Sequence, residues 1–280
     1  MVVIGDPDPR PPLDEHVLSV ELGLTPDLTL ELLPESPSTN QVAAERAREG
    51  APDGLLVVAD HQTAGRGRLD RTWDTPAGAA ITFSLVLRPT VPASSWPWLP
   101  LLTGHTVSKA LASFGYETRV KWPNDVLIPS TGSGQAEWRK VAGILVERIE
   151  TDAGPAAVVG VGINVSTPAE ELPVPTATSL AVAHPDLTPT REGVLLGVVA
   201  AVREGYDAWQ AGGPEAAARL ASSYVAQCAT VGQHVRVDLP GGTSITGRAV
   251  DVDSDGRLVV ETGDGVEKVG AGDVVHVVPG

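Results

Sequence analysis

The sequence has little of three features that mark particular classes of protein. It contains a single cysteine, Cys228, which excludes a disulfide framework and a cysteine-rich metal site. No apolar run approaches the roughly 18 residues that a membrane-spanning helix needs. Basic residues are scarce, with 20 lysines and arginines against 35 aspartates and glutamates and a net charge of -15. This balance argues against a duplex-DNA binder, which usually presents a basic face to the phosphates.

The first residues also lack the features of a targeting sequence. Residues 1–16 are acidic and rich in proline, and no basic segment precedes an apolar one, so they do not form a signal peptide. Without a membrane span or a signal peptide, we expect a cytoplasmic protein. We expect residues 1–28 to be a poorly ordered leader before a larger domain over residues 29–226.

The apolar pattern predicts an α+β domain followed by a small barrel. Helices are expected from Ser38, with Gln41 completing a capping box, from near Pro100, and over residues 188–213. Apolar runs of strand length cover residues 54–62, 79–89, 116–128, 139–150 and 156–167. From residue 227 onward, β-rich runs alternate with Gly and Asp turns, which predicts a five- or six-stranded barrel over residues 227–280.

One segment, DHQTAGRGRLDRTW, concentrates positive charge in an otherwise acidic chain. Its central part, residues 65–71, is called the basic loop below. Three arginines and two glycines fall within it, namely Gly65, Arg66, Gly67, Arg68 and Arg71. Backbone N–H groups of a glycine-rich turn form a concave anion site, and arginine binds phosphate or carboxylate oxygens with two N–H groups. By itself the motif fits equally well a solvated basic loop or a short Arg-Gly segment of an RNA binder.

Three further stretches offer polar groups, each with a simpler structural explanation. Lys121, one of four lysines, lies in the apolar stretch VKWPND, where an ammonium suits a carboxylate or phosphate but could also extend to water. The STN sequence, residues 38–40, could contact an anion or simply cap a helix. Glycines in residues 140–145 and 160–165 indicate close approach by a ligand or tight packing, and Asn164 could be a core amide.

In combination, these stretches resemble the biotin protein ligases. The shared pattern is STN … HQTAGRGR … KWPND … K..GIL.E … GVGINV, followed by a small β-barrel, over roughly residues 30–280. The resemblance implies a mixed sheet flanked by helices, like the catalytic domain of class II aminoacyl-tRNA synthetases, with an SH3-like barrel after it. It implies a ligase that uses ATP and Mg²⁺ to make biotinyl-5′-AMP. The ligase then passes biotin to a lysine of a biotin carboxyl carrier domain of a carboxylase.

The resemblance also assigns roles to particular residues, with no metal ligand among them. The catalytic residues would be Lys121, Arg66 and Arg68. The biotin-binding residues would be Ser38, Thr39, Gln62, Gly65, Arg66, Gly67, Arg68, Lys121 and Gly143. The ATP-binding residues would be Arg66, Arg68, Arg71, Trp73, Lys121, Asn124, Lys140 and Asn164. The chemistry agrees, because attack of a carboxylate on the α-phosphate brings two anions together and cationic donors offset their repulsion.

Two features depart from the family pattern, and two other functions remain open. Asp70 stands where the family often has glycine, so it could pair with Arg71 or weaken nucleotide binding. Only 37 residues precede the STN motif, which predicts a ligase without the DNA-binding domain of the repressor relatives. One alternative is transfer of lipoate or octanoate on the same architecture. The other is a binding module in residues 227–280, which has few basic residues and no stacking aromatics for RNA.

Overall fold

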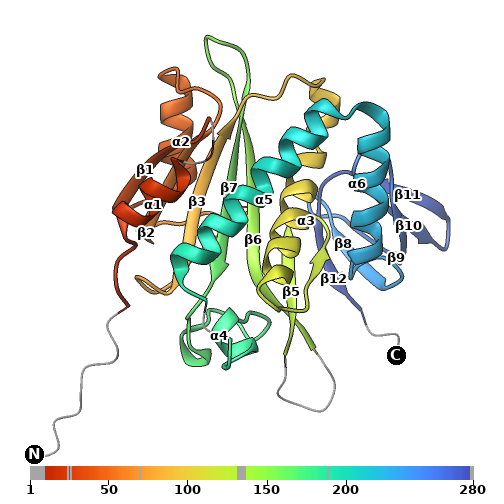
Figure 1. Ribbon diagram of the computed structural model, residues 1–280. Coiled ribbons are helices and arrows are strands. Elements are labelled where there is room, and N and C mark those ends of the chain that lie inside the picture. The colour runs from red at the N-terminus through yellow and green to blue at the C-terminus, as the bar shows by residue number, and fades with distance from the viewer. Residues whose placement is uncertain are drawn as a thin grey trace, which may run out of the picture.

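The computed structural model describes residues 10–23, 25, 27–69, 71–130, 137–187 and 189–277 (Figure 1). Asp70 and the chain from 131 to 136 therefore lie outside the described residues. In chain order the helices and strands are α1 (Glu15–Leu22), β1 (Thr29–Ser36), α2 (Thr39–Arg48), β2 (Leu55–Gln62), β3 (Ala80–Leu87), α3 (Trp98–Ser113), β4 (Arg119–Lys121), β5 (Asp125–Ser130), β6 (Glu137–Ile149), β7 (Ala156–Asn164), α4 (Leu180–Ala183), α5 (Arg191–Ala211), α6 (Gly213–Gln227), β8 (His234–Asp238), β9 (Ser244–Val252), β10 (Leu258–Thr262), β11 (Gly265–Val269) and β12 (Asp273–His276).

The larger sheet has seven strands in the order β1-β2-β3-β7-β6-β5-β4. β1 and β2 run parallel, and the other neighbouring strands run antiparallel, so the predicted mixed sheet is confirmed. The central strands β3 and β7 are buried along their whole length. Their sequences are near-continuous runs of apolar and small residues, as expected for strands covered on both faces.

Helices cover both faces of this sheet (Figure 1). α3 and α5 cross one face, where Val159 and Val161 of β7 join a large apolar cluster. α2 covers part of the opposite face, where Ala156 and Val158 join a smaller cluster with the alanines of that helix. The alternation follows from the two-residue period of a strand.

Helix α2 begins and ends where the sequence predicts, although its start lacks the expected capping box. Ser38 is the N-cap residue and is 3% exposed, yet its side chain makes no capping hydrogen bond. Gln41 instead donates from Nε2 to Glu45 Oε1 at 3.1 Å, one turn further along the helix. Gly50 follows the helix with φ of +96°, a conformation that glycine adopts without steric cost.

The described part of the expected leader contains a helix, α1, and is more ordered than its composition predicts. Asp14 accepts hydrogen bonds from the backbone N–H groups of His16 and Val17 and so caps α1. Leu18 is fully buried and Leu22 is 5% exposed, both in the core cluster on the α5 side of the sheet. The composition does not predict this helix, because the segment is rich in acidic residues and proline. Only a few apolar residues form the buried side of the helix. Residues 1–9 lie outside the described residues.

The second sheet has five antiparallel strands in the order β11-β10-β9-β8-β12. Among the described residues no ladder joins the edge strands β11 and β12, so the expected barrel is not closed. The indole Nε1 of Trp122 donates to Gly256 O at 3.0 Å, and that of Trp98 donates to Ser254 O at 2.7 Å. These bonds fix the second sheet beside the ends of β4 and α3. A start of this domain at residue 227 stays a prediction.

A search of the helices within the described ranges finds none that is both long and apolar enough to cross a membrane.

Candidate functional site

A pocket lies on the α2 face of the seven-stranded sheet, and the basic loop borders it. The cavity encloses about 780 Å³ when the open solvent at its mouth is included. The site residues predicted from the sequence that line it are Ser38, Thr39, Gln62, Arg66, Gly67, Arg68, Arg71, Trp73, Asn124, Lys140 and Gly143. Segments far apart in the chain therefore meet around one cavity.

Three of the predicted site residues do not line this pocket. Gly65 lies beneath it, where an added Cβ would come within 2.2 Å of the Trp73 carbonyl oxygen. Asn164 is 3% exposed and donates from Nδ2 to Thr178 O at 3.0 Å, as a core amide would. Lys121 stands opposite Asp125 in the β4–β5 ladder, and Asp125 does line the pocket.

The position of Lys121 follows from the alternation of β4. Val120, the preceding residue, is 1% exposed and packs in the cluster on the α3 side. Successive side chains of a strand point to opposite faces, so Lys121 belongs to the face that carries the pocket. It lies next to the pocket on that face.

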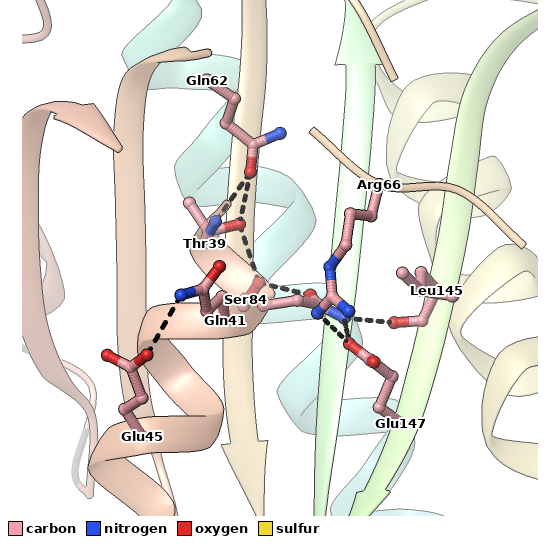
Figure 2. Close-up of polar contacts among 9 residues, drawn as sticks. Thr39, Gln41, Glu45, Gln62, Arg66, Ser84, Leu145 and Glu147 are labelled. Atoms are coloured by element: carbon pink, nitrogen blue, oxygen red, sulfur yellow. Dashed lines mark hydrogen bonds and ion pairs between the residues drawn. The ribbon is translucent and has the colours of Figure 1, made fainter. Parts of the chain in front are cut away.

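A chain of buried polar groups starts at the N-terminus of α2 (Figure 2). The backbone N–H of Thr39 donates to Gln62 Oε1 at 2.7 Å, and the Thr39 hydroxyl lies 3.1 Å from the same oxygen. Ser84 Oγ lies 2.8 Å from the Thr39 hydroxyl oxygen and 2.6 Å from Asn40 Oδ1. All four side chains are less than 9% exposed, so these contacts are protected from water.

The protons in this chain do not suffice for its contacts. Asn40 Nδ2 faces two acceptors, Leu145 O at 3.2 Å and Glu147 Oε2 at 2.7 Å, which fixes its oxygen toward Ser84. The hydroxyls of Thr39 and Ser84 then supply two protons for three oxygen–oxygen contacts. One contact therefore lacks a proton. Each hydroxyl or amide oxygen can accept two hydrogen bonds, so the chain can still accept one from an N–H group that enters the pocket.

Glycines form the floor of the pocket because neighbouring groups lie directly against the backbone. A Cβ on Gly160 would come within 2.0 Å of Asn40 Oδ1, and one on Gly162 within 2.5 Å of the Trp73 indole. At Gly143 the added atom would lie 3.1 Å from both Trp73 and Lys140. Any larger residue on β6 or β7 here would displace the side chains that line the pocket.

The basic loop folds back on itself and reaches both sheets. Its backbone closes through Gly67 N–H to Arg71 O at 2.6 Å. Arg66 donates from Nη2 to Glu147 Oε2 on β6 at 2.9 Å. Arg68 donates to Gly272 O, just before β12, at 3.2 Å, and it also lies 3.4 Å from Asn124 Oδ1.

Two carboxylates stand among the cations at the mouth. Asp273 of β12 forms an ion pair with Arg71, and this hydrogen bond raises the Arg71 pKa. Burial lowers the Arg68 pKa, although Asp125 and Asp273 oppose that effect by their charge. Lys140 Nζ lies 2.6 Å from Asp125 Oδ1. Arginine stays charged across the physiological pH range, so the mouth keeps fixed positive charges for an anion.

Sequence reasoning missed several residues of the site. Asn40, Asp125, Gly160 and Gly162 all fall inside the STN, KWPND and GVGINV stretches, so the motifs contained the signal although the residues were not selected. Asp273 carried no local signal, because only the tertiary fold brings β12 to the basic loop. Within the described ranges, no cluster of three or more His, Cys, Asp or Glu residues is placed to hold a metal ion.

Comparisons with known proteins agree with this geometry. Residues 32–164 match the biotin/lipoate A/B protein ligase family, and residues 230–277 match the biotin protein ligase C-terminal domain. The biotin–[acetyl-CoA-carboxylase] ligase of Mycobacterium tuberculosis is 39% identical over 96% of this chain and 97% of its own length. The bifunctional ligase/repressor BirA of Bacillus subtilis is 34% identical over 85% of this chain and 70% of its own length.

Solved structures give the same result. The biotin protein ligase from Aquifex aeolicus, in complex with biotin and ATP, superposes with a TM-score of 0.72 and 29% identity. The match covers 88% of this chain and 97% of the other. On its sequence, its fold and its pocket, this chain belongs to the biotin protein ligase family.

Proposed function

We propose that this chain is a ligase that joins biotin and ATP into biotinyl-5′-AMP and pyrophosphate. It then transfers biotin to a lysine of a biotin carboxyl carrier domain of acetyl-CoA carboxylase. The observation that carries the proposal is the convergence of a buried polar chain, a glycine floor and a basic loop on one pocket. The polar chain and the glycine floor suit a small flat molecule with N–H groups, and the basic loop suits a phosphate.

The polar chain from Gln62 to Asn40 supports biotin as the acid. The ureido ring of biotin carries two N–H groups, and the chain has unused acceptor capacity next to Thr39 and Ser84. A buried polar site of this kind rejects analogues that lack the matching donors, because its own groups would stay unpaired. Lipoate and octanoate have no such donors.

The cations at the mouth support ATP as the second substrate. Arg68, Arg71 and Lys140 line the same pocket together with Asn124. Lys121, on the same face of the sheet, is proposed to contact the biotin carboxylate and then the adenylate. Attack of that carboxylate on the α-phosphate would form the mixed anhydride and release pyrophosphate, while these donors offset the repulsion between the anions.

Mg²⁺ would enter this reaction bound to the phosphates. The described residues contain no cluster of carboxylates and imidazoles for a resident ion, and Asp125 is already paired with Lys140. Phosphate oxygens and water commonly supply most of the ligands of Mg²⁺. The ion would neutralise phosphate charge, and the residues of this chain would orient the nucleotide.

A role as a DNA-binding repressor is not part of the proposal. The match spans 97% of the M. tuberculosis ligase but only 70% of the bifunctional Bacillus subtilis protein. The acidic composition gives no support for binding to duplex phosphates. A cytoplasmic location belongs to the same proposal, because the ligase would meet ATP and its acceptor there.

The test is pyrophosphate release from ATP and Mg²⁺ by the purified protein, with biotin, lipoate, octanoate or no acid. We expect release with biotin alone, followed by biotin transfer when a carrier domain is added. Release with lipoate or octanoate would assign the chain to the related acyl-transfer activity. No release with any of the three acids would refute the proposed adenylation.

A further inference from the structure

Glu147 is a polar residue of the site that has no assigned role. It stands in β6, four residues after Gly143, and the alternation of the strand puts both on the pocket face. Its Oε2 accepts a hydrogen bond from Arg66 Nη2 at 2.9 Å (Figure 2) and another from Asn40 Nδ2 at 2.7 Å. A single carboxylate oxygen therefore joins the basic loop to the polar chain of α2.

The contact with Asn40 determines how the polar chain is oriented. Asn40 is 4% exposed, and its Nδ2 has two acceptors, Glu147 Oε2 and Leu145 O. With Nδ2 held on that side, Asn40 Oδ1 accepts from Ser84 Oγ at 2.6 Å. Gly160 leaves the space for this arrangement, since a Cβ there would reach within 2.0 Å of Oδ1.

The contact with Arg66 joins the first residues of the basic loop to β6. The carbonyl of Gly65 accepts from the Trp73 N–H at 2.8 Å, which closes the base of the loop. The side chain of Arg66, the residue after Gly65, extends to β6 and pairs with Glu147, as Figure 2 shows. The guanidinium of Arg66 thus contacts a carboxylate of the seven-stranded sheet. Arg68 and Arg71 instead contact Gly272, just before β12, and Asp273 of the second sheet.

We infer that Glu147 is a positioning residue that holds the basic loop over the pocket through Arg66 and aligns the polar chain through Asn40. The inference rests on the proposed function for the ligand that the loop would cover. Loss of the carboxylate would free the base of the loop while the rest of the fold stays intact. The adenylate would then leave faster, because opening of a loop that covers a site controls release of the bound molecule.

A matched ion pair provides the control. Arg46 and Glu31 approach to 2.8 Å with side chains 41% and 24% exposed, against 46% and 28% for Arg66 and Glu147. The control pair joins α2 to β1 away from the pocket lining. Glu31→Gln therefore removes a similar charge pair of similar exposure without touching the basic loop.

The first measurement is the rate of tryptic cleavage after Arg68 and Arg71 in the ligand-free protein. We expect Glu147→Gln to raise this rate by about two- to fivefold, which equals a shift of at most about 1 kcal/mol in loop opening, as for other partly exposed pairs. Glu31→Gln should leave the rate unchanged, and both variants should keep the wild-type melting temperature within a few degrees. An unchanged cleavage rate in Glu147→Gln would overturn the inference, whatever substrate the enzyme uses.

The second measurement is the dissociation rate of biotinyl-5′-AMP from Glu147→Gln, Arg66→Ala and the double variant. If Glu147 holds the loop through Arg66, Glu147→Gln should accelerate loss of the adenylate less in the Arg66→Ala background than in the wild-type protein. Additive effects would show that Glu147 acts apart from Arg66 and would overturn the pairing. If the wild-type protein makes no adenylate, the proposed function fails, and the cleavage experiment still decides the role of Glu147.

Discussion

The two faces of β7 serve different purposes although they belong to the same nine residues. One face carries Val159 and Ile163, which are fully buried against α3 and α5. The other carries Gly160 and Gly162, which leave space for Asn40 and Trp73. Large side chains thus fill one side of the strand, and two glycines leave space for a site on the other.

This difference separates stability from binding along one strand. Glycine in a strand weakens it, since it adds backbone entropy to the unfolded state and buries no side chain. The valines and isoleucines on the opposite face compensate by burying apolar area. Substitutions on the two faces of the seven-stranded sheet should therefore change different measured quantities.

The largest effect is expected on the pocket face, at Lys121. Lys121→Ala should slow adenylate formation by about 10²–10³-fold, the cost of losing one preorganised donor to a developing charge. Single-turnover formation of biotinyl-5′-AMP measures this rate, with Lys109→Ala on α3 as the control. Turnover close to wild type would remove Lys121 from the mechanism.

The next effect is expected at the floor of the pocket. Gly160→Ala places a Cβ 2.0 Å from Asn40 Oδ1, so Asn40 must leave Ser84. We expect the KM for biotin to rise by about tenfold or more, since a buried hydrogen bond left unmade costs about 1–3 kcal/mol. Steady-state kinetics measures it, and Gly263→Ala is the control, because an added Cβ there meets nothing within 4 Å. An unchanged KM would mean that the polar chain does not contact biotin.

Several strands of the seven-stranded sheet and the end of α2 could be predicted from the sequence, because short local runs of residues specify them. Apolar runs located β2, β3, β6 and β7, and the glycine after residue 49 located the end of α2. Helix α1 was missed, since its burial depends on distant contacts such as Leu13 N–H to Asp60. The barrel was predicted from the β-rich runs and turns after residue 227, and the ladder between β11 and β12 that closure requires is not formed in the described ranges.

The residues of the site that lie within sequence motifs could be predicted from the sequence. Motif residues such as Thr39, Gln62 and Arg68 meet around the pocket, as expected for segments that bind one ligand. The partners of these residues could not be predicted. Asp273 lies about 200 positions beyond Arg71, and only the packing of the second sheet brings them together. The roles of the predicted residues in catalysis stay predictions.

On the core face of β7, a moderate loss of stability is expected without a change in binding. Val159→Ala removes two buried methyl groups from the cluster beneath α3 and α5. We expect the free energy of unfolding to fall by about 1–3 kcal/mol, as for other truncations in a packed core. Urea denaturation measures the loss, and the KM for biotin at low temperature should stay at the wild-type value. A raised KM with unchanged stability would show that the two faces are not independent.

The smallest effect is expected where the second sheet meets the pocket. Asp273→Asn removes the carboxylate that pairs with Arg71, whose side chain is 64% exposed. Such an exposed pair contributes about 0–1 kcal/mol, so stability should barely change. The freed guanidinium should bind phosphate better and lower the KM for ATP by about two- to threefold at low salt, with no difference near 1 M salt because charges are screened there.

Asp207→Asn, which removes an exposed partner of Arg203 on α5, is the control. A rise in the KM for ATP of Asp273→Asn at low salt would show that the carboxylate does not compete with phosphate. Asp273, and with it the second sheet, would then position Arg71 for the nucleotide.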